Sequence, residues 1–99
     1  MVSPIEITTA PTYTLITVTA AGAVQTETSA TAPLAARKGV TFRNGSAGNI
    51  QMCNSGGTSY LTLEPGDSVV YILDGTGNVV FYYQTAQTSA TYLEREEWK

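Results

Sequence analysis

The sequence predicts an all-β domain: a small antiparallel β-sandwich, jelly-roll or Greek-key like, with an extended N-terminal arm. From residue 39 onward, apolar runs of five or six residues alternate with turn sequences rich in glycine, asparagine, proline and aspartate. A chain of 99 residues suits one domain around one hydrophobic core. The single cysteine, Cys53, leaves no internal disulfide, so we expect Cys53 to lie in a strand as a small apolar residue.

The first third of the chain differs from the rest. Residues 1–36 carry two acidic residues, no basic residue, and many alanines and threonines. We expect them to form one or two strands plus an extended arm or loop that packs on the domain, while residues 37–99 form the sandwich core. Residues 20–36 are weakly specified, and a segment of this kind can become ordered against a partner.

The clearest strand of this first third covers residues 13–19 (YTLITVT). Threonine, isoleucine and valine favour the extended backbone because they branch at Cβ. Alternation places Tyr13 and Leu15 on one face and Ile16 and Val18 on the other. We expect this strand to pack on the domain.

The runs GVTFRN and NIQMCN predict the next two strands. Val40 and Phe42 share one face of the first, and Ile50 and Met52 share one face of the second. Residues 44–49 (NGSAGN) lie between them, and asparagine and glycine tolerate the positive φ that tight turns need. We therefore predict a hairpin connection at residues 44–49.

A type II turn is predicted at EPGD, after the strand SYLTL. Pro65 presets φ at the second position, and Gly66 accepts the left-handed geometry at the third. Glu64, Asp67 and Asp74 lie in turns of neighbouring strands, where approaching carboxylates can bind calcium or hydrolyse glycosides. Carboxylates beside β-turns are also common for turn geometry alone.

The last third contains the most apolar runs, at residues 68–73 (SVVYIL) and 79–83 (VVFYY). We expect these to be central strands, joined by a second hairpin at residues 74–78 (DGTGN). Residues 91–98 extend naturally as a strand, although the charged residues 94–97 would also suit a helical turn. We predict a strand with a frayed, charged end.

Charge and hydropathy exclude several function classes. A net charge of −3 argues against nucleic-acid binding, which depends on basic clusters. No apolar stretch approaches the length of a membrane span, and the N-terminus lacks the basic and apolar regions of a secretory signal. Only 13% of residues are charged, and a threonine-rich, weakly charged surface suits a protein that packs against neighbours.

Catalysis is not expected. The chain contains no histidine, so it lacks the commonest general base and the commonest metal ligand. Its serines and threonines have no evident base partner, and neither lysine lies in an apolar run that would lower its pKa. We therefore expect no catalytic residue, no metal site and no cofactor.

One local concentration of positive charge stands out in the sequence. Arg37, Lys38 and Arg43 lie within seven residues of one another. Their partner could be an acidic neighbouring chain or simply water. We take these three residues as the candidate polar contacts to a partner protein.

Aromatic residues are the other candidate binding feature. Tyr82 and Tyr83 are adjacent and must point to opposite faces of a strand, so at least one is expected to meet solvent or another chain. With Tyr92 and Trp98 they can form an exposed aromatic interface, since exposed tyrosine and tryptophan mark both sugar platforms and protein interfaces. Tyrosine rings that cap a small core are the alternative interpretation.

Residues 36–98 resemble small all-β virion structural proteins of tailed bacteriophages. The residues that carry the resemblance are ARKGVTFRN, IQMC, LEPGDS and the final LE and EW. The family pattern has a basic R-K-G strand followed by N-x-S or N-x-G, then an L-x-P-G-(D/E)-S turn, and closes on a Leu-Glu strand with a tryptophan. Residues 1–35 have no motif that aligns.

The resemblance implies a capsid decoration (cement) protein in the virion, with the major capsid protein as partner and a homo-oligomer, often a trimer, as the assembly. Components of the neck or tail belong to the same class. A carbohydrate- or receptor-binding module that uses the exposed aromatic residues is the alternative from a different class.

Overall fold

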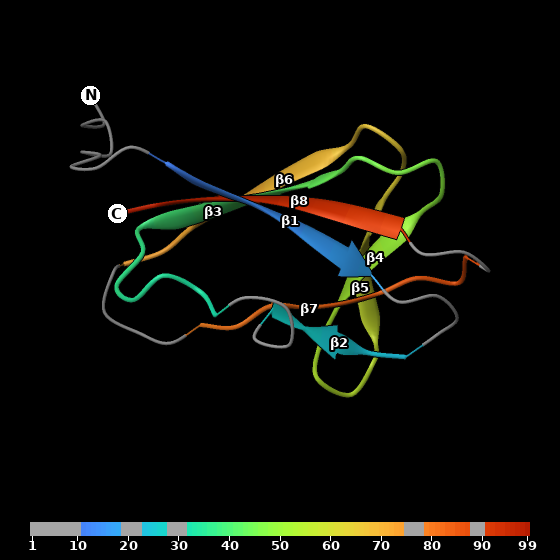
Figure 1. Ribbon diagram of the computed structural model, residues 1–99. Coiled ribbons are helices and arrows are strands. Elements are labelled where there is room, and N and C mark those ends of the chain that lie inside the picture. Colours follow the sequence, from blue (N-terminus) through green and yellow to red (C-terminus); the bar gives the residue numbers. More distant parts are fainter. Residues whose placement is uncertain (1–10, 19–22, 28–31, 75–78, 88–90) are drawn as a thin grey trace, which may run out of the picture.

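The computed structural model describes residues 11–18, 23–27, 32–74, 79–87 and 91–99. The described residues form eight strands: β1 (Thr12–Val18), β2 (Gln25–Thr26), β3 (Gly39–Asn44), β4 (Ile50–Cys53), β5 (Ser59–Leu63), β6 (Ser68–Ile72), β7 (Tyr82–Gln84) and β8 (Thr91–Trp98). Two four-stranded antiparallel sheets result, in the orders β1-β8-β3-β6 and β2-β7-β4-β5 (Figure 1). The predicted all-β, antiparallel architecture is confirmed. Among the described residues, no helix is long and apolar enough to cross a membrane.

The hydrophobic core receives side chains from both sheets. Alternation along each strand sends every second residue inward. The first sheet contributes Ile16, Val18, Val40, Phe42 and Leu93, and the second contributes Ile50, Met52, Leu63 and Tyr83. Phe42 also meets the rings of Tyr71 and Phe81 edge-on, with centroid distances of 6.1 and 5.6 Å. These contacts close one side of the core.

Several sequence predictions hold at the level of single strands. β3 and β5 have the predicted bounds. β1 begins one residue earlier than expected, and its predicted last residue, Thr19, lies outside the described residues. Ile16 and Val18 are buried whereas Tyr13 and Leu15 are more than half exposed, as the alternation predicts. Cys53 is buried at the end of β4, and burial raises the pKa of its thiol, so it behaves as an apolar residue.

Both predicted hairpins are wrong, because their flanking strands lie in different sheets. β3 pairs with β6 and β8, whereas β4 pairs with β5 and β7. β6 and β7 are likewise separated, and residues 75–78 of their connection lie outside the described residues. Turn chemistry specifies that the chain reverses, but it does not specify which strand becomes the neighbour.

The predicted order of the strands from centre to edge also needs correction. Of the two strands predicted to be central, β6 lies at the edge of its sheet. β7 is an inner strand, as predicted, but it is shorter than expected, with Val79 47% exposed outside it. β8 also occupies an inner position. It pairs with β1 up to Glu97 and with β3 up to Trp98, so its charged end is not frayed. The charges of β8 are compatible with an inner position because ion pairs compensate those that point inward, as described below.

The turn at EPGD has the predicted geometry. Gly66 has a φ of 87°, and the Asp67 N–H donates to the Glu64 carbonyl over 2.9 Å, as a type II turn requires. The Asp67 carboxylate accepts a hydrogen bond from the Glu64 N–H over 3.0 Å. This contact accounts for the aspartate at position 67 by its role in the turn. The turn connects β5 of one sheet to β6 of the other.

Candidate functional site

The charged residues of β8 divide between the two faces of its sheet. In a strand, successive side chains point to opposite faces. Glu94 and Glu96 therefore face outward, whereas Arg95 and Glu97 face the interior, where each is at most 1% exposed. This alternation creates two charged groups of different character, an outer-face site and a buried ionic cluster.

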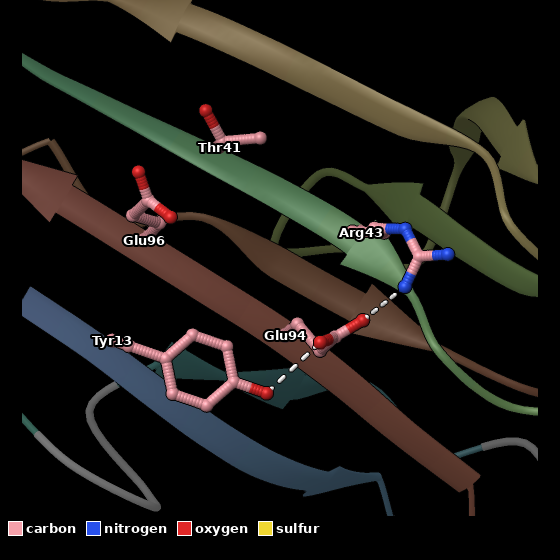
Figure 2. Close-up of a pocket in the computed structure, with 5 residues that line it drawn as sticks. All are labelled: Tyr13, Thr41, Arg43, Glu94 and Glu96. Atoms are coloured by element: carbon pink, nitrogen blue, oxygen red, sulfur yellow. Dashed lines mark hydrogen bonds and ion pairs between the residues drawn. The ribbon is translucent and has the colours of Figure 1, made fainter.

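The outer-face site is an open pocket of about 110 Å³ on the β1-β8-β3 surface. Its lining comes from three neighbouring strands: Tyr13 from β1, Thr41 and Arg43 from β3, and Glu94 and Glu96 from β8 (Figure 2). The register explains this grouping, because Tyr13 and Thr41 both lie opposite Glu96. Arg43 lies opposite Glu94 in the same way.

Glu94 is held by hydrogen bonds from both sides. The Tyr13 hydroxyl donates to Glu94 Oε1 over 2.9 Å, and Arg43 Nη1 contacts Oε2 at 2.6 Å (Figure 2). The bond from Arg43, followed by that from Tyr13, lowers the pKa of Glu94, while the bond to Glu94 raises the pKa of Tyr13. Glu94 is therefore a fixed carboxylate at neutral pH, which suits binding rather than proton donation.

Exposed apolar side chains surround this charged centre. On the same face, Leu15 lies opposite Glu94 and Tyr92 lies opposite Thr17, and both are about half exposed, at 54% and 45%. On the far side of β3, Val70 of β6 lies opposite Thr41 and is 53% exposed. The face thus combines an oriented ion pair with aromatic and aliphatic surface, which is typical of a protein-binding surface.

The buried ionic cluster consists of Glu27, Arg37, Arg95 and Glu97, two acids and two bases. Arg37 forms a bidentate pair with Glu27, with both contacts at 2.8 Å, and reaches Glu97 Oε2 at 2.9 Å. Arg95 lies 3.3 Å from Glu27 Oε1 and 3.1 Å from Glu97 Oε1. Burial by itself lowers the pKa of Arg37, but the two glutamates raise it above its ordinary value.

This cluster ties chain segments that are distant in sequence to β8. Glu27 follows β2, Arg37 precedes β3, and both side chains meet on the inner side of β8. Backbone groups join the network, because the Phe81 N–H donates to Glu27 and the Leu34 N–H donates to Glu97, each over 2.8 Å. Every charge in the cluster therefore has an opposite charge beside it, and we assign the cluster a structural role.

The structure separates the three basic residues that the sequence analysis grouped. The Arg37 side chain is 3% exposed and bound within the buried cluster, so its selection as a surface contact is wrong. Lys38 is half-buried, and its backbone N–H pairs with the Trp98 carbonyl over 2.7 Å. Arg43 is the accessible member, with a side chain 53% exposed in the outer-face site.

The candidate aromatic residues also divide. Tyr83 is 1% exposed and belongs to the core, Tyr82 is half-buried, and Tyr92 is exposed on the outer face. Trp98 is half-buried, and its ring covers Gly39 so closely that a Cβ on that glycine would overlap the indole. Among the four, Tyr92 is therefore the one that offers an open ring.

Sequence reasoning missed four residues of the outer-face site, namely Tyr13, Thr41, Glu94 and Glu96. The available signal was the alternation over residues 91–98, which sets Glu94 and Glu96 on one face. That signal did not reveal that β1 and β3 flank β8, because these strands are far apart in the chain. Within the described residues, no group of three or more cysteine, aspartate or glutamate side chains is arranged to hold a metal ion.

Comparisons with protein-family models, with curated proteins and with solved structures found no match for this chain. The geometry of the site and the motif resemblance are therefore the observations from which a function can be inferred.

Proposed function

We propose that this chain is a non-enzymatic virion structural protein of a tailed bacteriophage, a capsid decoration (cement) protein that binds and stabilises the capsid shell. The observation that carries the proposal is the outer face of the β1-β8-β3-β6 sheet. There an oriented Arg43–Glu94 pair lies among exposed apolar side chains in an open surface. Aromatic side chains and arginine are the residue types enriched in protein interfaces.

The order of the strands supports a finer description of the fold as a jelly roll. The sheet orders β1-β8-β3-β6 and β2-β7-β4-β5 place mostly non-consecutive strands side by side, as two Greek keys wrapped into two sheets would do. Viral capsid proteins and lectins both use this architecture. The topology is therefore compatible with the virion role and with the alternative below.

An extended N-terminal arm is part of the proposal. Residues 12–18 and 25–26 are strands of the two sheets, and Glu27 belongs to the buried cluster. An arm can thus be sought in residues 1–10, which lie outside the described residues. A variant without residues 1–10 that binds capsids with full affinity would remove the arm from the proposal.

The first experiment is to quantify this protein by mass spectrometry in purified virions made by the genome that encodes it. A copy number comparable to that of the major capsid protein is the expected result. A few copies per particle would move the protein to the neck or tail. Absence from the particle would overturn the virion role.

A second experiment tests the surface directly. Capsids that lack this protein are incubated with the wild type, with Arg43→Glu and with Thr62→Glu, and bound protein is measured after sedimentation. Arg43→Glu places like charges beside Glu94 on the outer face, so binding should weaken strongly at low salt. Thr62 is exposed on β5 of the other sheet, so Thr62→Glu should bind as the wild type does. Equal binding of all three would exclude this face as the capsid contact.

A carbohydrate- or receptor-binding module is the second candidate. It is favoured by one observation, the Tyr13 side chain lining a pocket with two carboxylates, with Tyr92 exposed on the same sheet face. Aromatic faces stack on sugars, and carboxylates accept hydrogen bonds from sugar hydroxyls. A glycan array without any binding, together with tyrosine fluorescence that does not respond to sugars, would dispose of this candidate.

A further inference from the structure

The two edges of the β1-β8-β3-β6 sheet are unusual because neither edge strand carries a charged residue. β1 reads TYTLITV and β6 reads SVVYI. Both pair with their inner neighbours in unbroken register, without a bulge. Soluble monomers commonly protect sheet edges with charges, prolines, bulges or very short strands, and these two strands contain none of those devices.

In this sheet the charged residues lie on the inner strands, whereas protective charges usually lie on the edge strands. Its inner strands carry the charged residues, with Arg43 on β3 and four consecutive charged residues on β8. The other sheet has different edges. β2 is two residues long, and the register between β4 and β5 shifts at Met52 and Cys53. Regular, uncharged edges are thus confined, among the described strands, to β1 and β6.

Both strands also carry exposed apolar side chains. Tyr13 and Leu15 on β1 are 57% and 54% exposed, and Val70 and Ile72 on β6 are 53% and 61% exposed. All four lie on the outer face of the sheet, as their alternation with inward residues requires. In a β-sheet, aromatic and β-branched side chains on adjacent strands stabilise the pairing.

The polarity of the strands is compatible with a second copy of this chain as the partner. Neighbouring strands in this sheet are all antiparallel, so β1 and β6 run in opposite directions. A second copy whose β1 lies beside β6 of the first would therefore continue the antiparallel ladder. Tyr13 and Leu15 of one copy would then lie near Val70 and Ile72 of the next, with no charge to desolvate in either strand.

We propose that copies of this chain associate head to tail, β1 of one copy pairing with β6 of the next to extend the sheet. The interface is heterologous, since two different edges meet, and it closes into a ring if the rotation per copy permits. This inference depends on the sheet edges and does not require the capsid role.

Sedimentation velocity on the wild type and on single lysine variants tests the interface. Leu15→Lys alters β1, Val70→Lys alters β6, and Thr62→Lys on the edge strand β5 is the matched control, since all three positions are exposed. The wild type and Thr62→Lys should form oligomers, and each of the other two variants alone should be monomeric. An equal mixture of Leu15→Lys and Val70→Lys should form a dimer of one copy of each, because one intact β1 and one intact β6 remain.

Other outcomes would overturn the proposal. A wild type that is monomeric at its highest soluble concentration would exclude the interface. Dissociation by Val70→Lys but not by Leu15→Lys would indicate a symmetric β6–β6 contact instead. If Leu15→Lys fails to fold by circular dichroism, Thr17→Lys, exposed on the same face of β1, replaces it and must give the same mixture result.

Discussion

The two faces of β8 hold similar ionic groups in opposite environments. On the inner face, Arg95 and Glu97 join Glu27 and Arg37, and all four side chains are at most 3% exposed. On the outer face, Glu94 pairs with Arg43, whose side chain is 53% exposed. The distances are similar, at 2.8 Å for the shortest buried pair and 2.6 Å for the exposed pair.

Distance alone does not determine how much an ion pair contributes to stability. Water and salt screen an exposed pair, so it contributes about 0–1 kcal/mol to stability. A buried group depends on its partners because it has lost its water, and removal of one partner leaves an uncompensated charge. The inner group is therefore expected to decide whether the protein folds, and the outer group is free to serve binding.

The largest effect is expected from Glu27→Gln. The variant removes one of two negative charges beside Arg37 and Arg95, so we expect the free energy of unfolding to fall by about 3–5 kcal/mol. That is a large part of a typical stability of about 5–15 kcal/mol. Denaturant unfolding followed by circular dichroism measures the change. Glu96→Gln, the same chemical change on the outer face, is the control and should stay within about 0.5 kcal/mol of the wild type.

A substitution at Gly39 tests a tightly packed contact on the otherwise open outer face, the contact with the Trp98 ring. An added Cβ would overlap the Trp98 ring, so Gly39→Ala should destabilise the protein by about 1–3 kcal/mol. In a Trp98→Ala background the same change should cost less, because the ring is gone. A thermal-unfolding double-mutant cycle measures this coupling, and equal costs in both backgrounds would contradict the contact.

Alkaline pH should weaken the inner side of the sandwich. Burial, followed by the charge of Glu27, raises the pKa of Tyr83 to about 12. The unfolded chain loses the same proton near pH 10, so this contribution to stability is complete below pH 10 and declines as pH rises from about 10 to 12. Denaturant midpoints across this range should fall, and the slope should be smaller in Tyr83→Phe. If the denaturant midpoint of Tyr83→Phe fell as steeply with pH as that of the wild type, groups other than Tyr83 would cause the loss of stability.

The smallest effect is expected at the outer-face pair. Arg43→Ala should lower stability by at most about 1 kcal/mol, and the loss should shrink in high salt. The lowered pKa of Glu94 adds a pH signature: its contribution is present at neutral pH and is lost as pH falls through the acidic range where Glu94 protonates. Thermal unfolding at neutral and acidic pH, with and without salt, measures both effects. If Arg43→Ala lowered stability as much as Glu27→Gln, the outer-face pair would matter as much for folding as the buried cluster, contrary to this prediction.

The sequence alone predicted much of the local structure. Period-two alternation identified β1, β3, β4 and β5, because a strand that is buried on one face must alternate. The turn at Pro65-Gly66 was predictable because proline and glycine restrict φ at those positions. Of the candidate site, Arg43 and Tyr92 were named from the sequence and do lie on the outer face.

Neither the neighbours of each strand nor the burial of each charge could be predicted from the sequence. The sequence shows Arg37, Lys38 and Arg43 as one basic group, yet Arg37 enters the interior to meet Glu27 and Glu97, while Arg43 stays at the surface. The frayed end expected at residues 94–97 is an inner strand because Arg95 and Glu97 find partners from distant segments. Local propensity and alternation act over a few residues, whereas strand order and ion pairing depend on contacts between distant residues, such as Tyr13 and Glu94, 81 positions apart.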